Sequence, residues 1–410
     1  MSTATNSDWW RSNKMRGKVA VIGVGMIKFG ELFDKSLENM IQEAYLNCLN
    51  SVDKGIDPKE IKAAWFGQWS GGFIGQGAQS GQSLASFIGN REIPVTRLEN
   101  ACPTGGDTFR HACLGVASGL YDVVLALGAE KMRDKPAAES LGGAGSGGGA
   151  ETGSHPAWMI GQGGPSIQAM HATRQMYELG YTMEDFARVA VKNHHNGTLC
   201  PYAHYQFEVT IERVLGSYIV CWPLHLFDCC PQTDGAAAAI VCRADLAKKY
   251  TDKPVYVLGS NVGTDHSQLW DRQSFVEQLS SVRAARGAFE MAGIKPEDVD
   301  FAELHDCFTN TELMNIEDVG FARKGKAAGM LKDGEFDMHG RLPINPSGGL
   351  KAHGHPIAAT GLGQIFEVVT QLREEAGKRQ VKLRNGIGVQ HNVGGPAFGV
   401  SVVNILSRSM

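Results

Sequence analysis

Short apolar runs recur along the chain, and stretches with helical periodicity separate them. KVAVIGVG (18–25) and KPVYVLGS (253–260) each lead into a glycine turn. After the first run, apolar residues from Leu37 to Leu49 fall at the spacing of an amphipathic helix, with Ser36 as the candidate N-cap. Strands without polar alternation, separated by helices, favour the α/β class with a largely parallel sheet that helices cover on both faces.

This pattern occurs twice. GIDPKEIKAAWFG (55–67) and GIKPEDVDFAELH (293–305) share a Gly-Ile start, a proline-led acidic turn and a strand-like run, at an offset of 238 residues. CPTGG (102–106) and NPSGG (345–349) are almost the same string at an offset of 243. The sequence therefore predicts a duplicated α/β architecture in which the two turns hold equivalent places.

The repeat divides the chain into three predicted parts. Residues 17–135 form a first half and residues 251–410 form a second half. Residues 136–250 interrupt the rhythm with LGGAGSGGGAETGSHP (141–156), which is too glycine-rich for a helix or a central strand, and then with two helical patterns. We expect this part to be an inserted lid or loop subdomain that then returns to the first half.

Composition excludes several classes of protein. The chain has 410 residues, 43% of them hydrophobic and 20% charged, and a net charge of -4, which gives no sign of a nucleic-acid-binding surface. No apolar stretch is long enough for a membrane span, and the N-terminal residues have no apolar segment of the kind a secretory signal needs. The nine cysteines are odd in number and show no zinc spacing, so we expect a reduced, cytoplasmic protein without a bound metal.

Cys102 is the candidate nucleophile. It follows an extended stretch and precedes a predicted helix, whose first N–H groups would lower the pKa of a thiol there. Gly105 and Gly106 would let a substrate or the other half of the fold approach closely. A buried structural cysteine is the competing interpretation, and we prefer it for Cys48 and Cys113, which lie on apolar helix faces.

Histidines gather in the second half, each at a strand end or in a glycine-rich turn. The segments are ELHDCFTN (303–310), KAHGHPIAATG (351–361) and GVQHNVGGPAFG (388–399). Any one of these histidines is as well explained by a structural role. Together they lie at the strand ends where α/β folds collect their sites, and they supply the bases and donors that thiol-based acyl chemistry needs.

The combination of HDCF (305–308), GHP (354–356), QHN (390–392) and NPSGG resembles the thiolase superfamily, in particular the sterol-carrier-protein-2 type, which is acetyl-CoA acetyltransferase-like. A bacterial benzoylsuccinyl-CoA thiolase subunit is a narrower candidate. The resemblance covers residues 17 to 405. It implies a duplicated thiolase fold with αβαβα layers and two mixed, mostly parallel sheets.

The resemblance also implies roles. Cys102 would be the acylated nucleophile and His355 its base, with His305 completing an oxyanion site and Cys307 serving as the second acid/base. The backbone near Gly394 would form a second oxyanion site with that of Cys102. The remaining expected lining residues are His391, Asn392 and Asn345.

The implied reaction is CoA-dependent cleavage of a 3-oxoacyl-CoA, or the reverse Claisen condensation, through an acyl-cysteine. Coenzyme A is then a substrate, and no cofactor is permanently bound. The resemblance further implies a homodimer and a small zinc-ribbon/OB-fold partner subunit, and neither nucleic acid nor a membrane as a binding partner.

Three departures from the family pattern leave the acyl specificity open: Pro103 after the nucleophile, His353 before GHP, and Ala358 after it. Aromatic and methionine side chains near Trp158 and Met170 are compatible with a bulky acyl group, but we prefer to read them as core. Three alternative functions also stay open: a decarboxylating ketoacyl synthase, a C-acyltransferase or carbon–carbon lyase, and a non-catalytic acyl-CoA-binding scaffold subunit.

Overall fold

The computed structural model describes residues 15–72, 80–136 and 163–410. Within them, nine strands form one hydrogen-bonded sheet in the order β3-β2-β4-β7-β1-β8-β11-β10-β9. The strands are β1 (Val19–Met26), β2 (Ala63–Gly67), β3 (Val95–Leu98), β4 (Val123–Glu130), β7 (Gly235–Arg243), β8 (Val255–Thr264), β9 (Phe301–Glu303), β10 (Ile387–Gly394) and β11 (Val400–Ser407).

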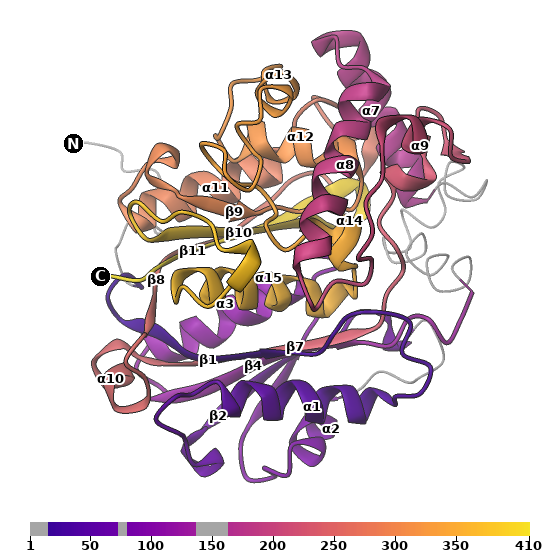
Figure 1. Ribbon diagram of the computed structural model, residues 1–410. Coiled ribbons are helices and arrows are strands. Elements are labelled where there is room, and N and C mark those ends of the chain that lie inside the picture. Colours follow the sequence, from indigo (N-terminus) through magenta and orange to yellow (C-terminus); the bar gives the residue numbers. More distant parts are fainter. Residues whose placement is uncertain (1–14, 73–79, 137–162) are drawn as a thin grey trace.

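The sheet folds into two layers that correspond to the two halves of the repeat. The layers join where β1 pairs with β8, with Ala20 opposite Tyr256 and Val21 opposite Val255. Figure 1 shows helices α3 (Thr104–Ala117) and α15 (Ile357–Leu372) between the layers, α1 (Leu37–Asn50) and α2 (Gly81–Phe87) below, and α11 (Leu279–Ala292) and α12 (Thr309–Asp318) above. The αβαβα layering that the resemblance implied is confirmed.

The prediction of mostly parallel strands is wrong. Only β2–β3, β2–β4 and β9–β10 are parallel, and the other five pairings are antiparallel. In each half the last strand, β7 or β11, runs back between the first strand and the strand that follows the central helix. A strand that is buried on both faces is apolar along its whole length whichever way it runs, so the hydrophobic pattern does not reveal its direction.

Helix α1 begins and packs as its sequence predicts. Ser36 caps it, because the Ser36 hydroxyl accepts the N–H of Asn39 while the Asn39 side chain accepts the N–H of Ser36. Its buried positions form one apolar face against the sheet: Met40, Ile41, Ala44, Tyr45 and Cys48.

The two central helices come close because glycines face their partner. A Cβ added to Gly105 would lie 2.6 Å from the carbonyl oxygen of Ala358 on α15, and one added to Gly106 would lie 2.6 Å from Val402 on β11. No real side chain tolerates such contacts, so these two glycines permit the approach of the second half, as predicted.

The CPTGG and NPSGG turns hold equivalent places but lead to different helices. Ile344 pairs in parallel with Ala302 of β9, as β3 pairs with β2, and NPSGG follows directly. However, helix α14 (Gly349–His353) ends after five residues at Gly354, whose φ of 105° breaks the helix. The long helix α15 begins only after this break, which places His355 at its N-terminal end.

The middle of the chain packs on the second half before it rejoins the first. Helices α7 (Gly164–Leu179), α8 (Met183–Leu199) and α9 (Ile211–Leu215) precede β7, and α8 packs against α12 and α14. Four smaller elements, besides short 3₁₀ turns, complete the described part of this region and of the second half: β5 (Ile219–Cys221) and β6 (Leu224–His225), which form a hairpin, α10 (Ala247–Tyr250) and α13 (Ala327–Lys332). The domain boundaries stay a prediction.

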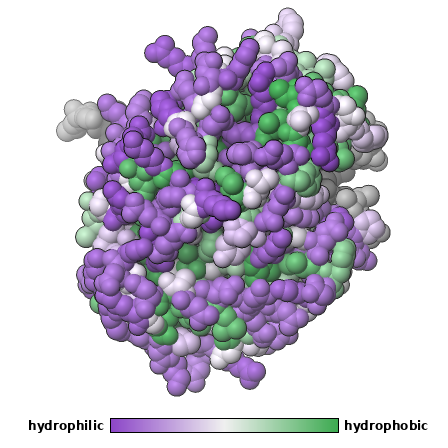
Figure 2. Space-filling view, in the orientation of Figure 1, coloured by the Kyte–Doolittle hydropathy of each residue, from purple (hydrophilic) through white to green (hydrophobic). Residues whose placement is uncertain are grey.

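Met170 is half-buried and packs against the core of the second half, as the core interpretation expects, whereas Trp158 and Met159 lie outside the described residues. Figure 2 shows one mostly hydrophilic face with separate hydrophobic areas. In the described part of the chain, no helix is both long and apolar enough to cross a membrane.

Candidate active site

A tight turn holds Cys102 just before helix α3. Thr104 accepts the N–H of Asn100 at 2.8 Å and donates its hydroxyl to the Ala101 carbonyl at 2.5 Å. Ala101 has a φ of 52°, a left-handed conformation that is unusual for a residue other than glycine. The turn leaves Cys102 half-buried at the end of α3 that faces the second half.

The structure brings Cys102 together with two of the predicted histidines. Its Sγ atom and one ring nitrogen each of His305 and His355 all lie within 4.8 Å of one another. The two imidazole rings meet edge to face, with centroids 5.1 Å apart. The thiol thus comes from the first half of the fold and both imidazoles come from the second.

The expected lowering of the Cys102 pKa is wrong for this resting structure. Burial raises the pKa of the thiol to about 12 and outweighs the backbone N–H groups of Cys102 itself and of Gly395, which act in the other direction. Cys102 lies before the first turn of α3 rather than inside it, and packed atoms surround its sulfur. The resting group is therefore a neutral thiol that needs a base.

His355 is neutral and is oriented to accept a proton. Burial lowers its pKa to about 3. Its Nδ1 lies 2.7 Å from the hydroxyl of Thr360, and that hydroxyl donates its own proton to the carbonyl of Pro356. Thr360 therefore accepts from Nδ1–H, which leaves the lone pair on Nε2. Nε2 has no partner among the described residues and is the nitrogen available to Cys102.

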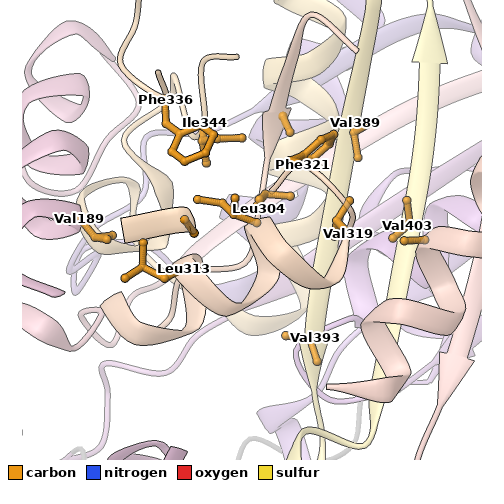
Figure 3. Packing of buried hydrophobic residues seen from close by; sticks show 14 of the residues in the cluster. Val189, Leu304, Leu313, Val319, Phe321, Phe336, Ile344, Val389, Val393 and Val403 are labelled. Carbon is orange, nitrogen blue, oxygen red and sulfur yellow. The ribbon is translucent and has the colours of Figure 1, made fainter. Parts of the chain in front are cut away.

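His305 is completely buried. Burial, and to a smaller extent the nearby His355 and His391, hold its pKa well below the usual value. Its Nδ1 lies 3.3 Å from the side-chain nitrogen of Asn392, while its Nε2 has no partner in the described part of the chain. Leu304 fixes this segment from behind, because it is buried in the core cluster shown in Figure 3, which includes Leu313 and Ile344.

Cys307 is nearly inaccessible, with 4% of its surface exposed. Burial, and then the neighbouring sulfurs of Cys230 and Cys102, hold its pKa well above the usual value. The thiol of Cys307 is therefore protonated. All nine cysteines are free thiols, and Cys48 and Cys113 are buried core residues as predicted.

Gly394 lies directly against Cys102. A Cβ at this position would lie 2.6 Å from the Cβ of Cys102 and 2.9 Å from both its backbone nitrogen and its sulfur. The strand end of β10 therefore forms a wall of the site that is built of backbone alone.

Asn345 and His391 are buried and hydrogen-bonded within the fold, and their role in lining a substrate stays a prediction. Asn345 is buried, its side-chain oxygen accepts the N–H of Leu304 at 2.7 Å, and its side-chain nitrogen donates to Glu312 at 2.7 Å. Both polar atoms of its side chain therefore have partners within the protein, and the bond to Leu304 holds the HDCF segment in place. His391 likewise lies behind His305, with its Nε2 3.0 Å from the hydroxyl of Ser281.

Sequence reasoning missed several residues that contact this site from behind. Thr360 lies inside the quoted GHPIAATG string, and Gln390 lies inside QHN, yet neither was assigned a role. Asn404 was missed altogether, although a lone asparagine in the apolar strand VSVVNILS was a usable signal. A buried amide in a central strand needs partners, and those partners lie at the site.

The Cys102–His305–His355 cluster is also the one set of metal-ligand side chains close enough to hold an ion within the described ranges. A thiol and two imidazoles are ligands that zinc accepts. The absence of a metal therefore stays a prediction, and the experiments below separate the two uses of these groups.

The site thus combines a thiol before central helix α3 with one imidazole before α15 and another after strand β9, within a duplicated α/β fold. The family description "Thiolase, N-terminal domain" matches residues 19–217, and "Thiolase C-terminal domain-like" matches residues 261–408. The chain belongs to the thiolase family.

Curated relatives match most of the chain. The acetyl-CoA acetyltransferase of Methanothermobacter thermautotrophicus is 44% identical over 95% of this chain and 99% of that protein. Sterol carrier protein 2 of Bos taurus is 33% identical over 93% of this chain and 70% of its own length. The benzoylsuccinyl-CoA thiolase subunit BbsB of Thauera aromatica is 34% identical over 93% of this chain and 96% of the subunit.

Among solved structures, Ltp2-ChsH2(DUF35) aldolase matches with a TM-score of 0.82 and 25% identity, covering 96% of this chain and 99% of that chain. The resemblance drawn from HDCF, GHP and QHN is confirmed at the level of the family. The relatives support an acyltransferase.

Proposed function

We propose that this protein is a thiolase that cleaves or forms 3-oxoacyl-CoA thioesters through an acyl-Cys102 intermediate. The observation that carries the proposal is the cluster of Cys102 Sγ and the two imidazoles within 4.8 Å, with the Nε2 atoms of both rings unpartnered among the described residues. A buried polar atom without a partner is costly, and a substrate oxygen or a thiol proton would satisfy it.

The cleavage steps follow from the protonation states. Nε2 of His355 takes the proton of the Cys102 thiol as the sulfur attacks the 3-oxo carbon of the substrate. The bond between C2 and C3 then breaks, and its electron pair forms the enolate of the shortened thioester. His305 and the newly protonated His355 bind the enolate oxygen.

Cys307 then donates its proton to C2, which releases the thioester that contains C1 and C2 of the substrate. The remaining acyl group stays on Cys102. The thiol of coenzyme A gives its proton to the Cys307 thiolate and attacks the carbonyl of the acyl-cysteine. The Cys102 thiolate leaves and recovers its proton from His355. The cycle restores every group and needs no oxidant or reductant.

The direct test is to trap the intermediate. The protein is incubated with acetyl-CoA and with longer 3-oxoacyl-CoA thioesters, and the peptide that contains Cys102 is weighed. We expect an added acyl mass in the wild type and none in Cys102→Ser. Pretreatment with a chelator should leave the adduct unchanged, and loss of the adduct after chelation would assign the cluster to a metal instead.

The trapping experiment, combined with a condensation assay, separates the alternatives. A decarboxylating synthase would need a malonyl thioester for carbon–carbon bond formation, whereas a thiolase condenses two acetyl thioesters. A scaffold subunit would bind acyl-CoA but leave Cys102 unmodified. The aldolase relative favours a carbon–carbon lyase as the second candidate, and such an enzyme would work without coenzyme A and without an acyl-cysteine.

We further propose that the protein forms a homodimer and works with a small partner subunit. The support is indirect: one relative is named as a thiolase subunit, and the matching aldolase structure names a second component. Size-exclusion chromatography with light scattering, alone and after co-expression with the neighbouring reading frames, tests both parts. A monomer would count against the first part, and a homodimer that is fully active alone would count against the second.

A further inference from the structure

Three buried amide side chains connect the backbone of helix α3 to His305. Asn404 on β11, and Gln390 and Asn392 on β10, are all fully inaccessible to solvent. Asn404 Nδ2 lies 3.2 Å from the carbonyl oxygen of Gly106 and 2.6 Å from Gln390 Oε1. Gln390 Nε2 lies 2.8 Å from Asn392 Oδ1, and Asn392 Nδ2 lies 3.3 Å from His305 Nδ1.

The direction of this amide relay is fixed at one end. A backbone carbonyl can only accept a hydrogen bond, so the NH₂ group of Asn404 must face Gly106 and, with it, Gln390. The hydroxyl of Ser260 donates to the opposite atom, Asn404 Oδ1, at 2.5 Å, which agrees with this orientation. Gln390 then presents its oxygen to Asn404 and its NH₂ group to the oxygen of Asn392.

The hydrogen bond between Asn392 and His305, the last in the relay, determines which ring nitrogen of His305 carries the proton. With its oxygen facing Gln390, Asn392 presents its NH₂ group, a pure donor, to His305 Nδ1, which must therefore be the acceptor. A neutral imidazole with Nδ1 as acceptor carries its proton on Nε2. Nε2 of His305 is an atom without a partner in the described structure.

We propose that the Asn404–Gln390–Asn392 relay holds His305 in the Nε2–H tautomer, so that His305 is a fixed hydrogen-bond donor in the site. His355 is held in the opposite tautomer by Thr360. One imidazole therefore donates and the other accepts, although both are neutral and buried. Gln390 and Asn404 are positioning residues that act through His305, and their catalytic consequence rests on the proposed function.

Gln364 provides a matched control inside the same network. Its Oε1 accepts from Asn392 at 2.7 Å and from Gln390 at 3.0 Å, and its own NH₂ group has no partner in the described ranges. Removing Gln364 therefore breaks buried hydrogen bonds beside Asn392 without interrupting the path from Gly106 to His305. Removing Gln390 interrupts that path.

The test reads the tautomer directly. Long-range ¹H–¹⁵N correlation spectra of the full protein labelled with ¹⁵N-histidine distinguish Nε2–H from Nδ1–H, and the His305 signal is assigned by its loss in His305→Gln. We expect Nε2–H in the wild type and in Gln364→Met, and a second, Nδ1–H population in Gln390→Met. In Asn392→Asp the carboxylate accepts from Nδ1, so the tautomer inverts.

Two half-reactions supply the catalytic readout. Exchange of the C2 protons of acetyl-CoA with deuterated solvent requires a donor to the enolate, and it should fall about 10²-fold in Asn392→Asp, the effect of losing one oxyanion donor. Acyl exchange between acetyl-CoA and free coenzyme A proceeds through Cys102 and His355 and should be much less affected.

Two results would overturn the proposed relay: a wild-type spectrum in which His305 carries its proton on Nδ1, or the same His305 tautomer populations in Gln390→Met and Gln364→Met. Absence of acyl exchange in the wild type would instead refute the proposed function, while the tautomer of His305 measured by NMR would remain valid.

Discussion

Gly394→Ala tests whether the backbone wall beside Cys102 sets the position of the nucleophile. The φ of Gly394 is not in the left-handed region, so alanine is compatible with the backbone itself. The new methyl group, however, would lie 2.6 Å from Cys102 Cβ, whereas ordinary contact begins at 3.4 Å. The strand end and the Cys102 turn must therefore separate by about 0.8 Å.

A displacement of that size should be far more costly for catalysis than for folding. Overpacking a well-packed site costs about 1–3 kcal/mol of stability, while misplacing a reacting group by about 1 Å costs about 10²-fold in rate. We expect the rate of Cys102 acylation by acetyl-CoA, followed by quenched-flow mass spectrometry, to fall by about that factor.

Gly388→Ala is the matched control. Gly388 lies on the same strand, and a Cβ there would come equally close, 2.6 Å, to the ring of Phe301, which lies away from the nucleophile. Both variants should lower the midpoint of thermal unfolding, but only Gly394→Ala should slow acylation. Wild-type acylation in Gly394→Ala, or an equal slowing in both variants, would refute the reasoning.

Three further predictions follow from the site. Cys307→Ala should abolish carbon–carbon cleavage while acyl exchange persists, because cleavage needs a proton at carbon, whereas in exchange no Cys307 thiolate forms and His355 can take and return the thiol proton; equal loss of both activities would contradict that role. Thr360→Val should slow acylation by about tenfold or more, part of what a positioned base supplies, because the tautomer of His355 is no longer held, whereas Thr360→Ser should keep the wild-type rate. Alkylation of Cys102 by iodoacetamide in the free protein should keep rising with pH up to at least about pH 10, because burial raises the thiol pKa to about 12; a plateau near neutral pH would show a thiolate already formed.

The order of strands and helices could be predicted from the sequence, but the direction of some strands could not. The repeat at 55–67 and 293–305 marks β2 and β9 correctly, and Ser36 marks the start of α1. Strand β7 has an apolar run that fits either direction, because both of its faces are buried. Its antiparallel place follows from tertiary packing, which local sequence does not encode.

The candidate site shows the same limit at the level of single atoms. The motifs identified Cys102, His305 and His355, and the structure brings the three together. The motif residue Asn345 nevertheless turns inward to hold Leu304, and burial reverses the expected pKa shift of Cys102. Both outcomes depend on which atoms surround a group after folding, and a residue's spacing along the chain does not determine that.

The asymmetry between the two halves explains why one turn carries a thiol and the other does not. Helix α3 runs without a break from the CPTGG turn, so Cys102 lies at the inner end of a central helix. The NPSGG turn leads only to α14, and the break at Gly354 moves the start of the second central helix to the GHP segment. The first turns of α3 and α15 therefore meet with the Cys102 thiol preceding one helix and the His355 imidazole preceding the other. The close packing of Gly105 against the carbonyl of Ala358 brings the starts of the two central helices together, so the proposed chemistry depends on a backbone contact in the core.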